Sequence, residues 1–278
     1  MNEKIFIEEC TDILEKVITK KPLVHHMTNY VTVNDCANVT LAIGASPIMS
    51  DAIEEVNEIV SISSSLVLNI GTLNDRTVES MIAAGRKANK INIPVIFDPV
   101  GAGASLFRNN TSKDILEKVK INILRGNISE IRYIAGFNAN TKGVDASEND
   151  KNNTCQEAAE IAYSLAKKQK CIVAITGATD VISDGERTIY IENGHPALSN
   201  ITGTGCMCSS LVGAFNGAAP DLPLQATVAA LLCMGIAGEI AYEKAGKFGN
   251  GSFRSAIIDA ISNMNKNILS ERSRIYEK

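Results

Sequence analysis

Short runs of apolar, β-branched residues alternate with longer amphipathic stretches along most of this chain. This alternation predicts βαβ units, because two neighbouring parallel strands need a crossover of a dozen or more residues, usually a helix. We therefore expect an α/β fold of three layers (α/β/α) around a central, mostly parallel sheet. The expected strands are residues 23–26, 66–70, 94–98, 122–124 and 172–176, and the expected helices are residues 6–19, 31–43, 76–89 and 155–168.

The pattern changes after Thr176. Residues 180–183 and 187–192 are alternating runs on either side of Asp184-Gly185-Glu186, a turn signal that predicts an antiparallel hairpin at the edge of the sheet. The last third is expected to form helices over residues 206–215, 224–245 and 253–271. Residues 226–238 are apolar on nearly every helical face, so this helix is expected to lie between other helices or between subunits.

The composition favours one large globular domain that acts on small molecules. The chain has 278 residues, 45% of them apolar, which is enough for a single core, and we expect one domain over residues 1–278. A formal charge of −4 gives no basic footprint for nucleic acid or anionic membrane. The N-terminus has no signal-peptide pattern and the run at 226–238 is short for a bilayer span, so a cytoplasmic protein is expected.

The glycine-rich segment Thr202-Gly203-Thr204-Gly205-Cys206 leads directly into a predicted helix. Glycines let the backbone approach an anion closely, and the free N–H groups at a helix N-terminus carry partial positive charge. The segment is therefore suited to stabilise a phosphoryl group during its transfer. The alternative for this motif alone is an ordinary glycine-containing helix start.

Charged residues follow two of the predicted strands, where ligands bind in open α/β sheets. Asp98 ends one strand before Pro99-Val100-Gly101, and is suited to hold Mg²⁺ through water. Arg125 is placed to pair with phosphate oxygens, and Glu130 to reach the metal. The structural alternatives are a turn-forming Asp-Pro at Asp98, and a helix cap in which Glu130 only favours the helix N-terminus.

Three further polar or soft side chains stand at predicted strand ends or connections. The Thr176 hydroxyl can meet a nucleotide, although for this feature alone we prefer the interpretation as a simple turn. Asn29 and Met49 suit a pocket for a small, flat heteroaromatic ring. The alternative places Met49 in the core, and for His25 and His26 we prefer a structural role in which the backbone satisfies both rings.

Taken together, these motifs resemble the hydroxyethylthiazole kinases, ribokinase-like enzymes of thiamin salvage. The resemblance covers most of the chain, and the motifs come in the family's order. The matching stretches are residues 22–29, 44–49, 69–73, 98–104, 125–131 and 202–207.

The resemblance implies that ATP phosphorylates the hydroxyl of 5-(2-hydroxyethyl)-4-methylthiazole, a thiazole alcohol of thiamin biosynthesis. It also implies Mg²⁺ and a homotrimer with active sites at the subunit interfaces. By position in the matched motifs, it assigns ATP to Arg125 and Thr176, the thiazole to Met49 and Gly203 and more weakly to Asn29, and the metal to Asp98 and Glu130.

Cys206 stands where most ribokinase-like relatives have an aspartate that acts as the base. Its ionisation state is open, because a helix N-terminus favours the thiolate whereas a facing phosphate opposes it. We expect Cys206 to lie near the substrate hydroxyl as a weak base. The backbone N–H groups from Gly203 to Cys206, those of Gly205 included, are expected to hold the transferring group.

Three other functions compete with this interpretation. A hydroxymethylpyrimidine kinase and an ATP-dependent dehydratase of hydrated nicotinamide nucleotides share the fold, but both usually carry aspartate at the position of Cys206. A non-catalytic ligand-binding relative would need neither Asp98 nor Glu130. ADP formation from Mg-ATP with each alcohol separates these possibilities.

Overall fold

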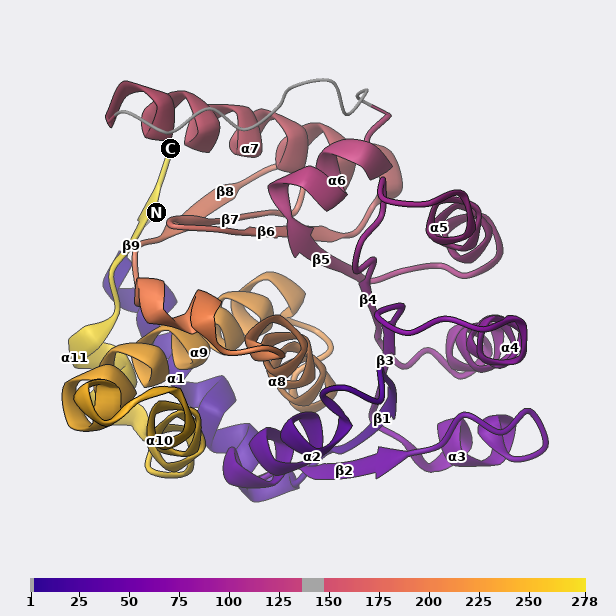
Figure 1. Cartoon of the computed structure of the whole chain (residues 1–278), viewed down its shortest axis with the longest axis horizontal. Helices are drawn as coiled ribbons and strands as arrows, with labels where there is room; N and C mark the ends of the chain where they lie inside the picture. The colour runs from indigo at the N-terminus through magenta and orange to yellow at the C-terminus, as the bar shows by residue number, and fades with distance from the viewer. Residues whose placement is uncertain (1–2, 137–147) are drawn as a thin grey trace.

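The structure, a computed structural model, describes residues 3–136 and 148–278. In these residues the strands form one nine-stranded sheet of order β2-β1-β3-β4-β5-β6-β7-β8-β9 (Figure 1). Neighbours from β2 to β6 are parallel, and those from β6 to β9 are antiparallel. The strands are β1 Leu23–Met27, β2 Ser46–Met49, β3 Ser65–Asn69, β4 Val95–Asp98, β5 Ile123–Asn127, β6 Ile172–Thr176, β7 Asp180–Ser183, β8 Thr188–Ile191 and β9 Ile275–Glu277.

Helices cover both faces of this sheet (Figure 1). One face carries α1 Glu3–Lys20, α2 Val33–Ala42, α8 Thr204–Ala218, α9 Pro223–Ala245, α10 Asn250–Ser262 and α11 Lys266–Arg272. The other face carries α3 Val56–Ile62, α4 Asp75–Ile91, α5 Leu106–Lys118, α6 Ile128–Ile134 and α7 Glu148–Gln169. Two short 3₁₀ helices, η1 Pro196–Asn200 and η2 Gly246–Phe248, flank α8 and α9 in the chain.

The central strand β3 shows why the fold has two cores. All of its residues are buried, and successive side chains point to opposite faces. Val67 belongs to the cluster with α8 and α9, whereas Leu66 and Leu68 belong to the cluster with α3 to α7. A strand buried on both faces needs a continuous apolar run, which is what the sequence shows here.

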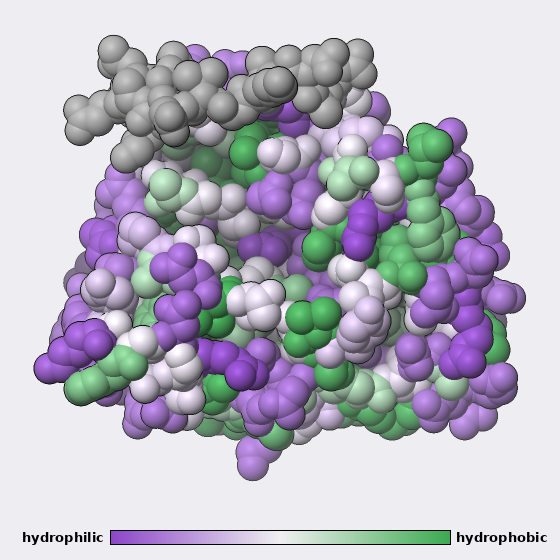
Figure 2. Space-filling model, viewed as in Figure 1, coloured by the Kyte–Doolittle hydropathy of each residue, from purple (hydrophilic) through white to green (hydrophobic). Residues whose placement is uncertain are grey.

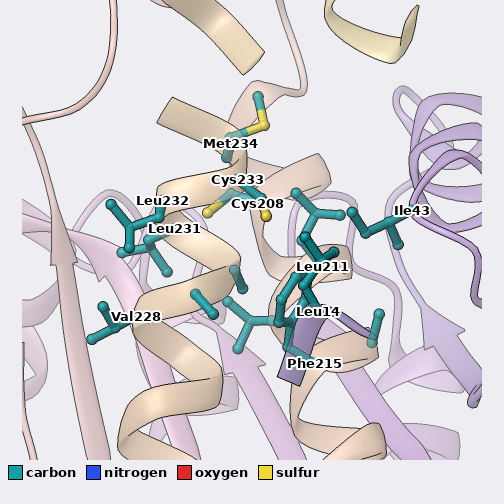
Figure 3. Packing of buried hydrophobic residues seen from close by; sticks show 14 of the residues in the cluster. Leu14, Ile43, Cys208, Leu211, Phe215, Val228, Leu231, Leu232, Cys233 and Met234 are labelled. Carbon is teal, nitrogen blue, oxygen red and sulfur yellow. The ribbon is translucent and has the colours of Figure 1, made fainter. Parts of the chain in front are cut away.

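Helix α9 is apolar because it lies inside the molecule. It packs against α1, α8 and α10 and against strands of the sheet. Figure 3 shows Val228, Leu231 and Leu232 on one side of this helix, and Leu14 of α1 with Leu211 and Phe215 of α8 on the other side. Residues Pro223–Phe248 are the one helical stretch of the described residues that is long and apolar enough to cross a membrane. This helical stretch is longer than the apolar run at residues 226–238, on which the sequence-based expectation rested. Of its most apolar 18-residue segment, 83% is buried inside the molecule. Packing in the core accounts for its composition.

The expected three-layer fold, the parallel strands and the antiparallel hairpin are confirmed, and β9 adds one more strand outside the hairpin. The elements that sequence patterns did not predict are short or lack a clear apolar stripe. β2 has four residues including Pro47 and lies at the sheet edge, where proline is tolerated. The helix expected over residues 253–271 is instead two helices, α10 and α11, because the Asn265 side chain accepts from the Ile268 N–H and starts a new helix.

His25 and His26 lie buried in β1, which supports their structural interpretation. The His25 ring donates to the Ser50 carbonyl at 2.8 Å, as expected. His26 is different, because its partner is the Thr40 hydroxyl at 3.2 Å and not the backbone. Burial lowers the pKa of His25, and burial followed by the neighbouring His25 lowers the pKa of His26 to about 3.

We expect His26 to make the protein less stable in acid. Since its pKa is lower in the folded than in the unfolded chain, the unfolded chain binds more protons below pH 6.5, and stability falls as the pH falls towards 3. Between pH 7.5 and pH 5 this one group costs about 2 kcal/mol of unfolding free energy. Urea unfolding of wild type and His26→Gln at both pH values checks this, because other titrating groups cancel in the comparison. Equal pH dependence of the two proteins would contradict it.

Candidate active site

A cleft of about 890 Å³ opens at the carboxyl ends of the parallel strands, beside the N-terminus of α8. Figure 2 shows a hollow with hydrophilic side chains near the middle of the molecular face, at the position between β5 and α8 in Figure 1. The cleft brings together most of the site residues expected from the sequence. They are Asn29, Asp98, Arg125, Glu130, Thr176, Gly203, Gly205 and Cys206.

Asp98 is the most deeply buried charged group of the cleft. Its Oδ2 accepts from Asn69 Nδ2 at 2.9 Å and from the Ser209 hydroxyl at 2.7 Å, and lies 3.6 Å from Arg125 Nη1. Burial raises the pKa of Asp98 to about 6, although Arg125 and the Ser209 hydrogen bond act in the opposite direction. The second oxygen, Oδ1, is buried without a hydrogen-bond partner. A buried, unpaired carboxylate oxygen in a polar cleft is a candidate cation ligand.

Glu130 lies nearby with both oxygens engaged by backbone. Oε1 accepts from Gly101 N–H and Oε2 from Asn127 N–H, each at 2.8 Å. Asn127 in turn caps α6 by accepting from the Glu130 N–H at 2.9 Å. The two residues thus form the helix cap that the sequence offered as the structural alternative for Glu130. Each carboxylate oxygen has a further lone pair, and Glu130 still lines the cleft. The cap therefore orients Glu130 without removing it from the cleft.

The carboxylates fit a magnesium ion better than a metal held only by protein. The described residues contain no group of three or more His, Cys, Asp or Glu side chains that could enclose a metal. Mg²⁺ usually keeps several waters and uses one or two carboxylates together with phosphate oxygens. The unpaired Asp98 Oδ1, with Glu130 close by, matches that ligand set.

Arg125 lies in β5, and its side chain lines the cleft. Its Nη2 donates to the Thr176 hydroxyl at 2.8 Å, while Nη1 pairs with Asp98. The start of α8 comes so close that a Cβ on Gly205 would lie 2.9 Å from Arg125 Nη1. Any larger residue at this position would force the guanidinium to shift, because the guanidinium lies directly against the helix N-terminus.

The glycine-rich segment has the backbone form that an anion site needs. Gly203 has φ 91°, in the left-handed region, and a Cβ there would come within 2.6 Å of Thr32 Cγ2. The first intrahelical bond runs from Met207 N–H to Gly203 O, so the earlier N–H groups, including that of Gly205, are left for a ligand. These groups face the cleft together with Arg125.

Two amides hold the Cys206 thiol at the end of this segment. The sulfur accepts from Asn29 Nδ2 at 3.1 Å and from Asn69 Nδ2 at 3.3 Å. The Asn29 Oδ1 accepts from Thr32, at 3.2 Å from the backbone N–H and 3.0 Å from the hydroxyl, which fixes the direction of the Asn29 amide. Cys206 is partly exposed and lines the cleft.

Met49 does not line this cleft. It is half-buried at the end of the edge strand β2, opposite His26 of β1. Its expected contact with a substrate is therefore not made within the cleft of one chain.

Several residues of the site were not singled out from the sequence. Asn69 ends β3 and is thus at a strand end, the signal that found Asp98. Ser209 stands three residues after Cys206 on α8, where helical spacing puts both on one face. Asp180 lines the cleft and accepts from Gly177 N–H at 2.9 Å, and burial raises its pKa to about 7.

A three-layer α/β/α fold with an arginine, two carboxylates and a glycine-rich helix N-terminus around one cleft defines a small-molecule kinase of the ribokinase-like class. The fold alone agrees, since a solved ribokinase-like superfamily protein from Enterococcus faecalis aligns with a TM-score of 0.60 over 92% of this chain and 95% of that chain, at 12% identity. Within that class the chain belongs to the hydroxyethylthiazole kinase family, whose sequence model matches residues 14–267.

Individual members of the family are similar to this chain along nearly their full length. A hydroxyethylthiazole kinase of Clostridium beijerinckii is 62% identical over 95% of this chain and 96% of the relative. The solved structure of the hydroxyethylthiazole kinase from Pyrococcus horikoshii has a TM-score of 0.88 and 38% identity, over 98% of this chain and 99% of that chain. The resemblance noted in the sequence is thereby confirmed.

Proposed function

We propose that this chain, acting as one domain, transfers the γ-phosphoryl group of ATP to the hydroxyl of 5-(2-hydroxyethyl)-4-methylthiazole, in thiamin biosynthesis and salvage. The observation that carries the proposal is the meeting of Asp98, Arg125 and the 203–206 segment in one cleft, in a chain of this family. An alcohol kinase needs these parts to bring two bound reactants into line and to spread the phosphoryl charge.

The cleft has both apolar and polar lining residues, which suits the different parts of ATP. Leu198, Leu231 and Met234 provide apolar surface and are assigned to the planar base. Arg125 and Thr176, joined by their hydrogen bond, are assigned to the phosphates. Asp98 and Glu130 are assigned to Mg²⁺, which neutralises phosphate charge when it is bound.

The protein's part in the reaction is positioning and charge stabilisation. The free N–H groups at Gly205 and Cys206, and the Arg125 guanidinium that lies against them, are assigned to the transferring group, where they would stabilise its negative charge. Asn29 and Cys206 are assigned to the acceptor alcohol, with Gly203 shaping the same pocket. The sulfur is assigned to receive the alcohol proton, but the transition state for phosphoryl transfer demands little from a base.

We further propose a homotrimer with active sites at subunit interfaces, in the cytoplasm. Met49 supports the interface sites, because it lies outside the cleft of its own chain. Tyr30 and Val31 also support them, since these large side chains beside the cleft are 79% and 57% exposed in the single chain. Sedimentation velocity gives the oligomeric state directly, and a monomer with full activity would rule out shared sites.

One assay tests the central proposal. ADP formation from Mg-ATP is measured with hydroxyethylthiazole and, separately, with hydroxymethylpyrimidine and with hydrated nicotinamide nucleotide. We expect turnover with the thiazole alcohol and little with the other two. Absence of turnover with the saturating thiazole would sink the proposal, and turnover with the pyrimidine instead would favour the neighbouring kinase.

A further inference from the structure

We propose that Asn69 is a positioning residue for the reaction: its side-chain amide holds the Asp98 carboxylate and the Cys206 thiol in a fixed relation. One buried side chain would then fix the positions of both Asp98, which is assigned to the metal, and Cys206, which is assigned to the acceptor alcohol. The inference rests on the proposed kinase function, and assigns a role to a residue that does not itself line the cleft.

The position of Asn69 follows from the parallel pairing of β3 and β4. Asn69 and Asp98 are the last residues of the two strands and stand opposite each other in the register. Asn69 Nδ2 donates to Asp98 Oδ2 at 2.9 Å and to Cys206 Sγ at 3.3 Å. The chain positions it connects are 29 and 137 residues away, so only the fold brings them together.

The orientation of the amide is determined by its other end. Asn69 Oδ1 accepts from the Gly71 N–H at 2.9 Å and from Asn29 Nδ2 at 3.1 Å. A backbone N–H can only donate, so this end must be the oxygen and the opposite end must be the NH₂ group. The Asn69 side chain is almost completely buried, and its donors and acceptor are all in use.

Two consequences follow for the reacting groups. Asp98 Oδ2 receives donors from both Asn69 and Ser209, which leaves Oδ1 as the oxygen available to a cation. The Cys206 sulfur receives donors from two amide NH₂ groups, which accept no hydrogen bond in return. The thiol hydrogen, when present, therefore points away from both amides.

Loss of stability alone cannot separate this role from a purely structural one, since removing a buried hydrogen-bonded amide destabilises the protein in either case. The two roles differ in what happens to the metal and to the thiol. A positioning residue affects the magnesium dependence of the reaction and the reactivity of Cys206, whereas a merely structural residue affects neither in the folded protein.

The experiment compares Asn69→Ala, Ser209→Ala and Asn74→Ala with wild type. Ser209 holds only Asp98, and Asn74 caps the neighbouring helix α4 away from the cleft. One readout is the Mg²⁺ concentration that gives half-maximal ADP formation at saturating ATP and thiazole alcohol. The other is the alkylation rate of Cys206 by iodoacetamide without substrates, followed by mass spectrometry of its peptide, with Cys206→Ala as the blank.

We expect Asn69→Ala to raise the half-saturating Mg²⁺ concentration about tenfold, the usual effect of losing a group that orients a ligand. The alkylation rate of its Cys206 should differ from wild type by at least threefold, because one of the two amides that hold the sulfur is gone. Ser209→Ala should change only the Mg²⁺ dependence, and Asn74→Ala neither readout.

Wild-type Mg²⁺ dependence and alkylation in a folded Asn69→Ala protein would overturn the proposal. If that variant does not fold, Asn69→Ser replaces it, since a serine is too short to reach Asp98 and Cys206 together, and the same outcomes decide. If wild type forms no ADP with the thiazole alcohol, the proposed function fails. The alkylation readout, which needs no substrate, then decides the role of Asn69 alone.

Discussion

Asp98→Ala is expected to lower kcat for thiazole phosphorylation by roughly three orders of magnitude, whereas Cys206→Ala loses only about tenfold. Asp98 is the buried carboxylate with an oxygen left for the metal, and without it the phosphate charge is not neutralised. Cys206 lies beside the expected alcohol site, but phosphoryl transfer asks little of a base. The difference between the two variants therefore separates charge neutralisation from proton removal.

Steady-state rates at saturating Mg-ATP and thiazole give this comparison. Asp98→Asn is measured beside Asp98→Ala, because it keeps the size of the side chain while removing the charge that pairs with Arg125. Circular dichroism establishes that each variant is folded. A Cys206→Ala enzyme that binds the thiazole but is completely inactive would contradict the weak-base role, and an active Asp98→Asn enzyme would contradict the metal assignment.

Arg125→Ala is expected to reduce kcat/KM for ATP by roughly 100-fold to 1000-fold, the range found when one charge-stabilising donor is removed. Arg125 is 11% exposed and links Asp98, Thr176 and the start of α8, so no other described side chain replaces it in the same place. Arg125→Lys should recover little, because an ammonium group cannot make the same forked contacts.

The matched control for Arg125 is Arg272→Ala. Arg272 pairs with Glu243 on the surface, away from the cleft, so its removal changes the charge equally and should leave the kinetics unchanged. Initial rates over a range of ATP concentrations separate kcat from KM. A normal KM and kcat for ATP in a folded Arg125→Ala protein would exclude Arg125 from the nucleotide site.

Much of the site was predictable because adjacent parallel strands end at one edge of the sheet. Asp98, Arg125 and Thr176 lie at or near the ends of β4, β5 and β6, which are neighbours in sequence and in space. Apolar runs and strand-end polar residues are local signals, so they can be detected without coordinates. The roles assigned to these residues stay predictions until the variants are measured.

The missed elements have weak local signals. β2 is short and contains a proline, and α5 carries polar residues on most of its faces. Its residue Arg108 nevertheless donates to the carbonyls of Ile70, Gly71 and Val100 and so joins the loops after β3 and β4. Contacts of this kind depend on residues that are far apart in the chain, and no periodicity reveals them.

By itself the sequence determined the order of the strands and helices that have a clear apolar pattern, the family, and the need for glycine at position 203, because these depend on local patterning and backbone conformation. Only the tertiary structure decided how the charged and polar groups act together. It buried Asp98 and so raised its pKa, brought Asn29 and Asn69 to Cys206 across 177 and 137 residues, and left Met49 outside the cleft. The physical reason is that burial and hydrogen-bond direction are properties of packed neighbours, not of any one segment.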